Sequence, residues 1–219
     1  MPTFLWKLKS RIETFTHTSK LFHNLLQKTL DELANKEIFF VEIGANDGVN
    51  CDPIYRYVVK YNWAGVYVEP QRAVFDKLVE NFSGKKNIYF ENIAITENAE
   101  KVTLFVPKDA FYSTMASLKR DVSSLVEFEL EKQEVDAKPF GYLASKYDLA
   151  NKKHLFLLID VEGHEKEIIY SIDFSTVKPA YILFEHRLMA YDAHRALNIF
   201  LTGNGYKIYI DKYDTLACR

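Results

Sequence analysis

Glycine, acidic and amide residues stand where three apolar segments of the chain end. The first segment, residues 38–43, is followed by the run Gly44-Ala45-Asn46-Asp47-Gly48. Glycines at such a turn let the backbone approach a ligand closely, and a helix start beyond it offers free N–H groups. Glu69 ends the second segment, and a carboxylate there can accept hydrogen bonds from both hydroxyls of a ribose. Asn92 lies in the last part of the third segment, where an amide can contact an adenine edge. Together the three positions predict a nucleoside pocket.

The spacing of the glycines helps to distinguish which nucleoside cofactor the pocket would bind. Dinucleotide-binding enzymes have the pattern G-x-G-x-x-G after their first strand. This chain has G-A-N-D-G at residues 44–48, which argues against a nicotinamide-linked oxidoreductase. A non-catalytic binding module is a further alternative. The acids and glycines retained at the strand ends argue against it.

These residues need a particular scaffold to bring them together. Apolar runs alternate along the chain with helical patterns, which predicts an α/β fold with a mostly parallel, twisted sheet and helices on both faces. In such sheets ligands bind outside the carboxyl ends of the strands. The expected strands are residues 38–43, 65–68, 87–95, 155–160, 180–185 and 206–210, and the expected helices are 53–61, 71–82, 141–149, 164–171 and 191–202.

Two segments lie outside this alternation. Residues 1–37 form a predicted amino-terminal helical extension, with helical apolar spacing over residues 3–36. One domain over residues 38–219 follows it. Within that domain, residues 107–141 are polar, Ser-rich and charged. A loop of this length in a compact domain is usually functional or partly disordered. We expect an active-site cover with a helix near residues 119–134, preceded by an edge strand or hairpin at 101–106.

Composition limits the partners. The 219 residues suit a single domain, and the net charge of −2 provides no broad basic field, so no nucleic-acid partner is expected. No apolar run approaches the ~20 residues of a membrane span. Cys51 and Cys218 form no redox or metal pair, which favours a reducing, cytoplasmic location. The amino-terminal helix is also a candidate contact for a homo-oligomer.

Four segments, in this order, resemble the FkbM-type methyltransferases: VEIGANDG at 41–48, VEP at 68–70, NIAI at 92–95 and IDVEGHE at 159–165. The similarity covers roughly residues 38–210, and I-D-V-E-G-x-E is its most specific element. The resemblance implies a Rossmann-like class I methyltransferase fold with S-adenosylmethionine as the methyl donor. It also implies O-methylation of a small-molecule or glycan acceptor, namely a hydroxyl of a sugar, glycan or natural product.

The resemblance also assigns roles to individual positions. Asp160, Glu162 and Glu165 fall at the mouth of the active site. There are departures from the family pattern: Leu158 stands where a Lys is common, and His164 occupies a variable position, which argues against its being an essential base. The residues implied to bind the cofactor are Glu42 (where Asp is more usual), Gly44, Asn46, Gly48, Glu69, Asn92 and Asp160.

Methyl transfer to oxygen requires removal of the hydroxyl proton, and two routes are open. His186, at the end of residues 180–185, is a candidate general base. Alternatively a divalent cation (Mg²⁺, Mn²⁺ or Ca²⁺) bound by Asp160, Glu185 and His186 would lower the pKa of the hydroxyl. Neighbouring parallel strands would bring these residues together. The structural alternative is an ion-pair cluster at Glu185-His186-Arg187, with Asp160 capping a helix.

Overall fold

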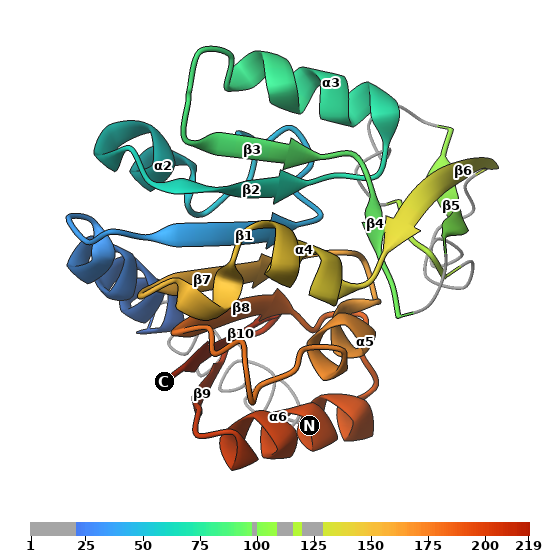
Figure 1. Cartoon of the computed structure of the whole chain (residues 1–219). Helices are drawn as coiled ribbons and strands as arrows, with labels where there is room; N and C mark the ends of the chain where they lie inside the picture. The colour runs from blue at the N-terminus through green and yellow to red at the C-terminus, as the bar shows by residue number, and fades with distance from the viewer. Residues whose placement is uncertain (1–20, 98–99, 109–115, 120–128) are drawn as a thin grey trace, which may run out of the picture.

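The computed structural model describes residues 21–97, 100–108, 116–119 and 129–219. Its centre is a seven-stranded sheet in the order β3-β2-β1-β7-β8-β10-β9 (Figure 1). The strands are β1 (Phe39–Ile43), β2 (Ala64–Val68), β3 (Ile88–Glu91), β7 (Leu155–Ile159), β8 (Tyr181–Glu185), β9 (Lys207–Ile210) and β10 (Asp214–Cys218).

Strand direction defines the fold and the position of the site. The pairs from β3 through β8 are parallel, whereas β10 is antiparallel to both of its neighbours, β8 and β9. The predicted α/β fold with a mostly parallel, Rossmann-like sheet is therefore confirmed. The chain runs outward from β1 through β2 to β3 and then crosses to β7 on the other side of β1. Such a reversal leaves a crevice at the carboxyl ends of β1 and β7.

Helices cover both faces of the sheet. One buried cluster joins Val41 to Leu143 of α4, Ile168 of α5 and Leu197 of α6. A second cluster joins Phe40 to residues of α2, α3 and the helix over residues 21–33. Because adjacent residues of β1 enter different clusters, the two helix layers lie on opposite faces. The bounds are α2 (Tyr55–Tyr61), α3 (Arg72–Asn81), α4 (Phe140–Lys146), α5 (Glu165–Tyr170) and α6 (Tyr191–Gly203).

The helical extension is only partly covered by the structure. Residues 21–33 are helical, as expected, while residues 3–20 lie outside the described part of the chain. None of the helices in the described ranges combines the length and apolar character needed to cross a membrane.

The segment after β3 forms a small second sheet, in the order β4-β6-β5. Its strands are β4 (Ala94–Ile95), β5 (Lys101–Pro107) and β6 (Leu130–Lys138). The predicted strand at 101–106 is confirmed. The helix expected near 119–134 is wrong for residues 130–134, which pair with β5, and residues 120–128 lie outside the described chain. Glu and Lys favour a helix in this stretch locally, but pairing along the whole of β5 overrides that preference.

Candidate active site

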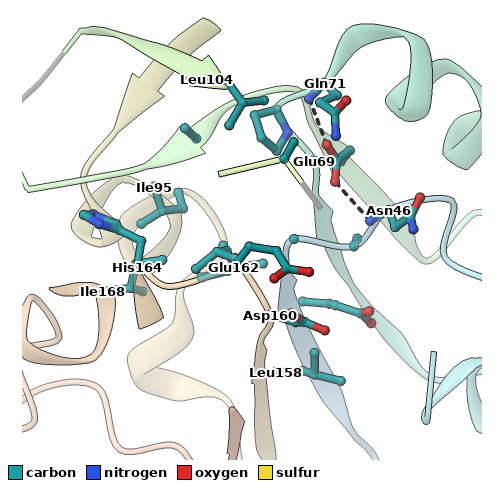
Figure 2. A pocket seen from close by; sticks show the side chains of 18 of the residues that line it. Asn46, Glu69, Gln71, Ile95, Leu104, Leu158, Asp160, Glu162, His164 and Ile168 are labelled. Carbon is teal, nitrogen blue, oxygen red and sulfur yellow. Dashed lines mark hydrogen bonds between the residues drawn. The ribbon is translucent and has the colours of Figure 1, made fainter. Parts of the chain in front are cut away.

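A cavity of about 310 Å³ lies at the carboxyl ends of β1, β2 and β7, with the small sheet as one wall (Figure 2). That wall includes Ile95 of β4 and Leu104 of β5. Leu118, which follows β5 in the chain, also lines the cavity. Of the predicted site residues, the cavity is lined by Glu42, Gly44, Asn46, Glu69, Asp160 and Glu162. Gly48, Asn92, Glu165, Glu185 and His186 are not part of its lining among the described residues.

Glu69 is the carboxylate that follows β2, and only 4% of the residue is exposed. One carboxylate oxygen accepts the backbone N–H of Asn46 at 3.0 Å, and the other accepts that of Gln71 at 2.8 Å. Burial raises the pKa of Glu69 to about 7, although both hydrogen bonds act to lower it. A carboxylate oxygen can accept more than one hydrogen bond, so Glu69 can still receive two vicinal hydroxyl groups from the cavity.

Asn92 has a different position from the one expected. Its amide nitrogen donates to the backbone carbonyl oxygens of Glu69, at 2.8 Å, and of Pro70, at 3.0 Å. The side chain thus holds the turn that carries Glu69. Three residues that follow it, Ile93, Ala94 and Ile95, line the cavity instead. Their apolar side chains provide a surface for a flat ring.

The two glycines of the first turn have separate roles. Gly44 has φ +84° and lines the cavity, and a Cβ there would lie 1.7 Å from the backbone oxygen of Asp160. Only glycine therefore lets β1 and β7 approach at this point. Gly48, with φ +70°, packs against Leu78 and Phe82 of the α3 segment, where a Cβ would meet side-chain atoms at 2.6 Å. Gly48 therefore lets the turn pack closely against these two side chains, on the side away from the cavity lining.

Glu42 is a buried carboxylate in the cavity wall. The residue is 3% exposed, and its Oε2 has no hydrogen-bond partner among the residues that the structure describes. Burial, reinforced by Asp52 and Asp160, raises its pKa well above the usual range. Burial likewise raises the pKa of Asp52 to about 7. Because Glu42 is among the residues that line the cavity, this buried oxygen without a partner is a candidate acceptor for a hydrogen bond from a ligand.

Three further carboxylates meet at the ends of β7 and β8. One carboxylate oxygen each from Asp160, Glu162 and Glu185 lies within 4.8 Å of the other two. Desolvation, followed by repulsion from neighbouring acids, raises the pKa of Asp160 to about 6, of Glu162 to about 7 and of Glu185 to about 8. The predicted adjacency of Asp160 and Glu185 is thus present. A cationic ligand would relieve the repulsion.

His186 lies apart from this acidic cluster. Its ring stacks on His194 with centroids 4.0 Å apart, and its Nδ1 lies 3.0 Å from Thr215 Oγ1. Desolvation, together with His194, lowers its pKa to about 4. Its predicted roles as base and metal ligand remain predictions. Among the described residues, the side chains close enough together to share a metal ion are those of Asp160, Glu162 and Glu185.

Glu165 supports the turn before α5. It is 1% exposed, and its Oε1 accepts the backbone N–H groups of Val161 at 3.1 Å and Gly163 at 2.9 Å. A carboxylate at the start of a helix also interacts favourably with the helix dipole. His164, which the sequence disfavoured as an essential base, does line the cavity. Burial lowers its pKa.

The raised pKa values predict a pH-dependent stability. Carboxyl groups that are neutral in the folded protein but ionise near pH 4 when unfolded stabilise the fold fully at low pH. That contribution is lost as the pH rises through about 6 to 8, the values of Asp160, Glu162 and Glu185. Glu185→Gln should therefore raise the melting temperature of the ligand-free protein at about pH 8 and change it little at about pH 5.

Thermal unfolding at the two pH values measures this effect. Glu80→Gln, on the exposed part of α3, is the control and should shift both melting temperatures by a similar small amount. An equal shift for Glu185→Gln at both pH values would show that Glu185 ionises normally in the folded protein.

The sequence pattern of the family described as the methyltransferase FkbM domain matches residues 42–208. The methyltransferase FkbM from Methylobacillus flagellatus is similar in structure, with 16% identity and a TM-score of 0.49 over 84% of this chain. This chain spans 44% of the length of that protein.

Two other solved structures are similar at lower sequence identity. Precorrin-6y C5,15-methyltransferase from Geobacter metallireducens has 12% identity and a TM-score of 0.44, covering 90% of this chain and 89% of its own. Ribosomal protein L11 methylase from Lactobacillus delbrueckii subsp. bulgaricus has 11% identity and a TM-score of 0.45, covering 89% and 76%. No curated protein sequence matches the chain significantly.

Proposed function

Because this chain belongs to the FkbM methyltransferase family, we propose that it transfers a methyl group from S-adenosylmethionine to a hydroxyl group of a sugar, glycan or natural product. One observation carries the cofactor assignment. The buried carboxylate of Glu69, held at both oxygens by backbone N–H groups, borders the cavity at the end of β2. Two fixed acceptor oxygens match the two adjacent hydroxyls of a ribose.

The remaining lining residues fit the other parts of the same molecule. Ile93 and Ile95 provide an apolar surface for the adenine. Gly44 lets the backbone approach the amino-acid portion, and the unsatisfied oxygen of Glu42 can accept a hydrogen bond from an ammonium group. S-adenosylmethionine, when bound, supplies a methyl group activated by a positively charged sulfur. The acidic lining, including Asp160, favours a cation of this kind.

Glu162 is the best placed side chain to accept the proton of the hydroxyl. It lines the cavity, and its pKa of about 7 lets a carboxylate oxygen take a proton near neutral pH. Asp160 borders the same space. Glu165, which the family resemblance places at the mouth of the active site, supports the turn that carries Glu162. His186 is a weaker base, with a pKa of about 4.

A methyl-transfer assay tests the proposal. The purified protein is incubated with S-adenosylmethionine and a panel of sugars, glycans and small alcohols. Release of S-adenosylhomocysteine and the mass of the acceptor are measured. We expect at least one hydroxyl acceptor to gain a methyl group. Binding of S-adenosylmethionine without transfer to any acceptor would favour the non-catalytic module. Binding of NAD alone would favour an oxidoreductase.

The metal route has its own test. If Glu162 removes the proton without the help of a metal, dialysis against EDTA should leave the rate of transfer unchanged. A loss of activity that Mg²⁺ or Mn²⁺ restores would instead assign Asp160, Glu162 and Glu185 to a metal site, since one carboxylate oxygen of each lies within 4.8 Å of the other two.

A further inference from the structure

Glu162 occupies a turn whose backbone conformation needs support. Its φ is +54°, in the left-handed region that side chains other than glycine seldom adopt. Such conformations persist at functional sites when surrounding contacts fix them. Glu165 fixes one side of the turn by accepting the N–H groups of Val161 and Gly163. The carbonyl groups of the turn require a second partner.

That partner comes from residues 116–119, more than 40 positions earlier in the chain. The hydroxyl of Ser117 donates to the backbone carbonyl of Glu162 at 2.7 Å. Lys119 Nζ donates to the carbonyl of Gly163 and, at 3.1 Å, to the carboxylate of Glu167 on α5. Ser117 is fully buried, whereas the side chain of Lys119 is 43% exposed. Of the two contacts, the one from Ser117 is better shielded from water.

Ser117 is itself held in place. Its backbone N–H donates to the carbonyl of Phe105 at 3.0 Å and its carbonyl accepts the N–H of Phe105 at 2.9 Å, so the residue is anchored to β5. Its hydroxyl also accepts the N–H of Lys119 at 3.0 Å. The flanking residues Ala116 and Leu118 line the cavity. One short segment therefore forms part of the cavity wall and holds the turn of Glu162.

We propose that Ser117 and Lys119 are positioning residues, which hold the turn of Glu162 in the conformation that presents its carboxylate to the cavity. The proposal rests on the proposed function, in which Glu162 receives the proton of the acceptor. Both residues act through backbone carbonyl groups and touch no reacting atom. Their loss should reduce turnover more than cofactor binding, because Glu69 and Asn46 are held by other contacts.

Ser117→Ala is the first test. We expect kcat to fall by about tenfold or more, because a small misplacement of a catalytic group is costly, with the Kd for S-adenosylmethionine changed by less than about twofold. Ser117→Thr keeps the hydroxyl and should restore most of kcat. Ser171→Ala is a matched control, because it removes a hydroxyl that donates to a backbone carbonyl, that of Ile168, over the same 2.7 Å.

Lys119→Met provides an independent variant. It should lower kcat less than Ser117→Ala, since the lysine is more exposed. Lys108→Met is its control, because Lys108 also pairs with one glutamate, Glu129, at the far end of the β5–β6 pairing. A value of kcat within about twofold of the wild type for Ser117→Ala, or an equal loss in Ser171→Ala, would overturn the proposal.

Hydrogen exchange separates this inference from the proposed function. The amides of Val161 and Gly163 should exchange faster in Ser117→Ala than in the wild type or in Ser171→Ala, because the turn loses one of its supports. Unchanged exchange would contradict the positioning role. If the wild-type protein transfers no methyl group, the proposed function fails, and the exchange rates alone decide whether Ser117 holds the turn.

Discussion

Replacing Glu69 by alanine is expected to weaken binding of S-adenosylmethionine by more than about tenfold, in line with ~1.5–3 kcal/mol for hydrogen bonds to a charged group. Both oxygens of this buried carboxylate are already fixed by the N–H groups of Asn46 and Gln71. The side chain is therefore preorganised to receive two ribose hydroxyls. Because its pKa is about 7, calorimetric titration at about pH 8 compares the proteins where the carboxylate is mostly ionised.

The variant also loses the acceptor of two backbone N–H groups, so its fold needs a separate check. Thermal unfolding shows whether Glu69→Ala remains folded at the temperature of the titration. Glu80→Ala removes a glutamate from the exposed part of α3 and should bind the cofactor as the wild type does. An unchanged dissociation constant in folded Glu69→Ala would refute the ribose assignment.

Gly44→Ala is expected to have the second large effect, on folding and on cofactor binding together. The new Cβ would lie 1.7 Å from the backbone oxygen of Asp160, and φ +84° disfavours alanine regardless of space. The backbone N–H of Asp160 donates to the carbonyl of Ile43 at 2.9 Å, so β1 and β7 would have to separate where they pair. We expect a loss of roughly 3 kcal/mol or more in the free energy of unfolding.

Gly141→Ala is the matched control for this substitution. Gly141 lies in α4, and a Cβ there would meet no atom within 4 Å. Alanine should raise the free energy of unfolding by about 0.5–1 kcal/mol, because it favours the helix. Denaturant unfolding and calorimetric titration measure both variants. Wild-type stability and affinity in Gly44→Ala would contradict the close approach of β1 and β7.

The central strands were predictable from the sequence because a buried parallel strand is a short, nearly continuous apolar run. Residues 38–43 and 155–160 illustrate this, and the structure has strands at Phe39–Ile43 and Leu155–Ile159. Two strands gave no such signal. In β6 only Ala137 is buried, and its charged residues resemble a helix surface. The strand β10 follows β9 after three residues and runs antiparallel to it, against the expected pattern.

The sequence predicted which strand ends form the site, but it did not predict the direction in which each side chain points. Glu69 and Asp160 line the cavity as expected, since position at a strand end decides their location. Asn92 follows a strand in the same way, yet its amide donates to backbone carbonyls. The contact of Ser117 with Glu162 joins segments more than 40 residues apart. No local pattern encodes it, although Gly163 does suggest a turn after the strand.

The location of the nucleoside tests the central claim most directly. A crystal structure with S-adenosylhomocysteine should show both ribose hydroxyls on the carboxylate of Glu69. The adenine should lie along Ile93 and Ile95, and the amino-acid portion beside Gly44. A nucleoside bound elsewhere on the protein, or bound in this cavity with its ribose away from Glu69, would contradict the assignment.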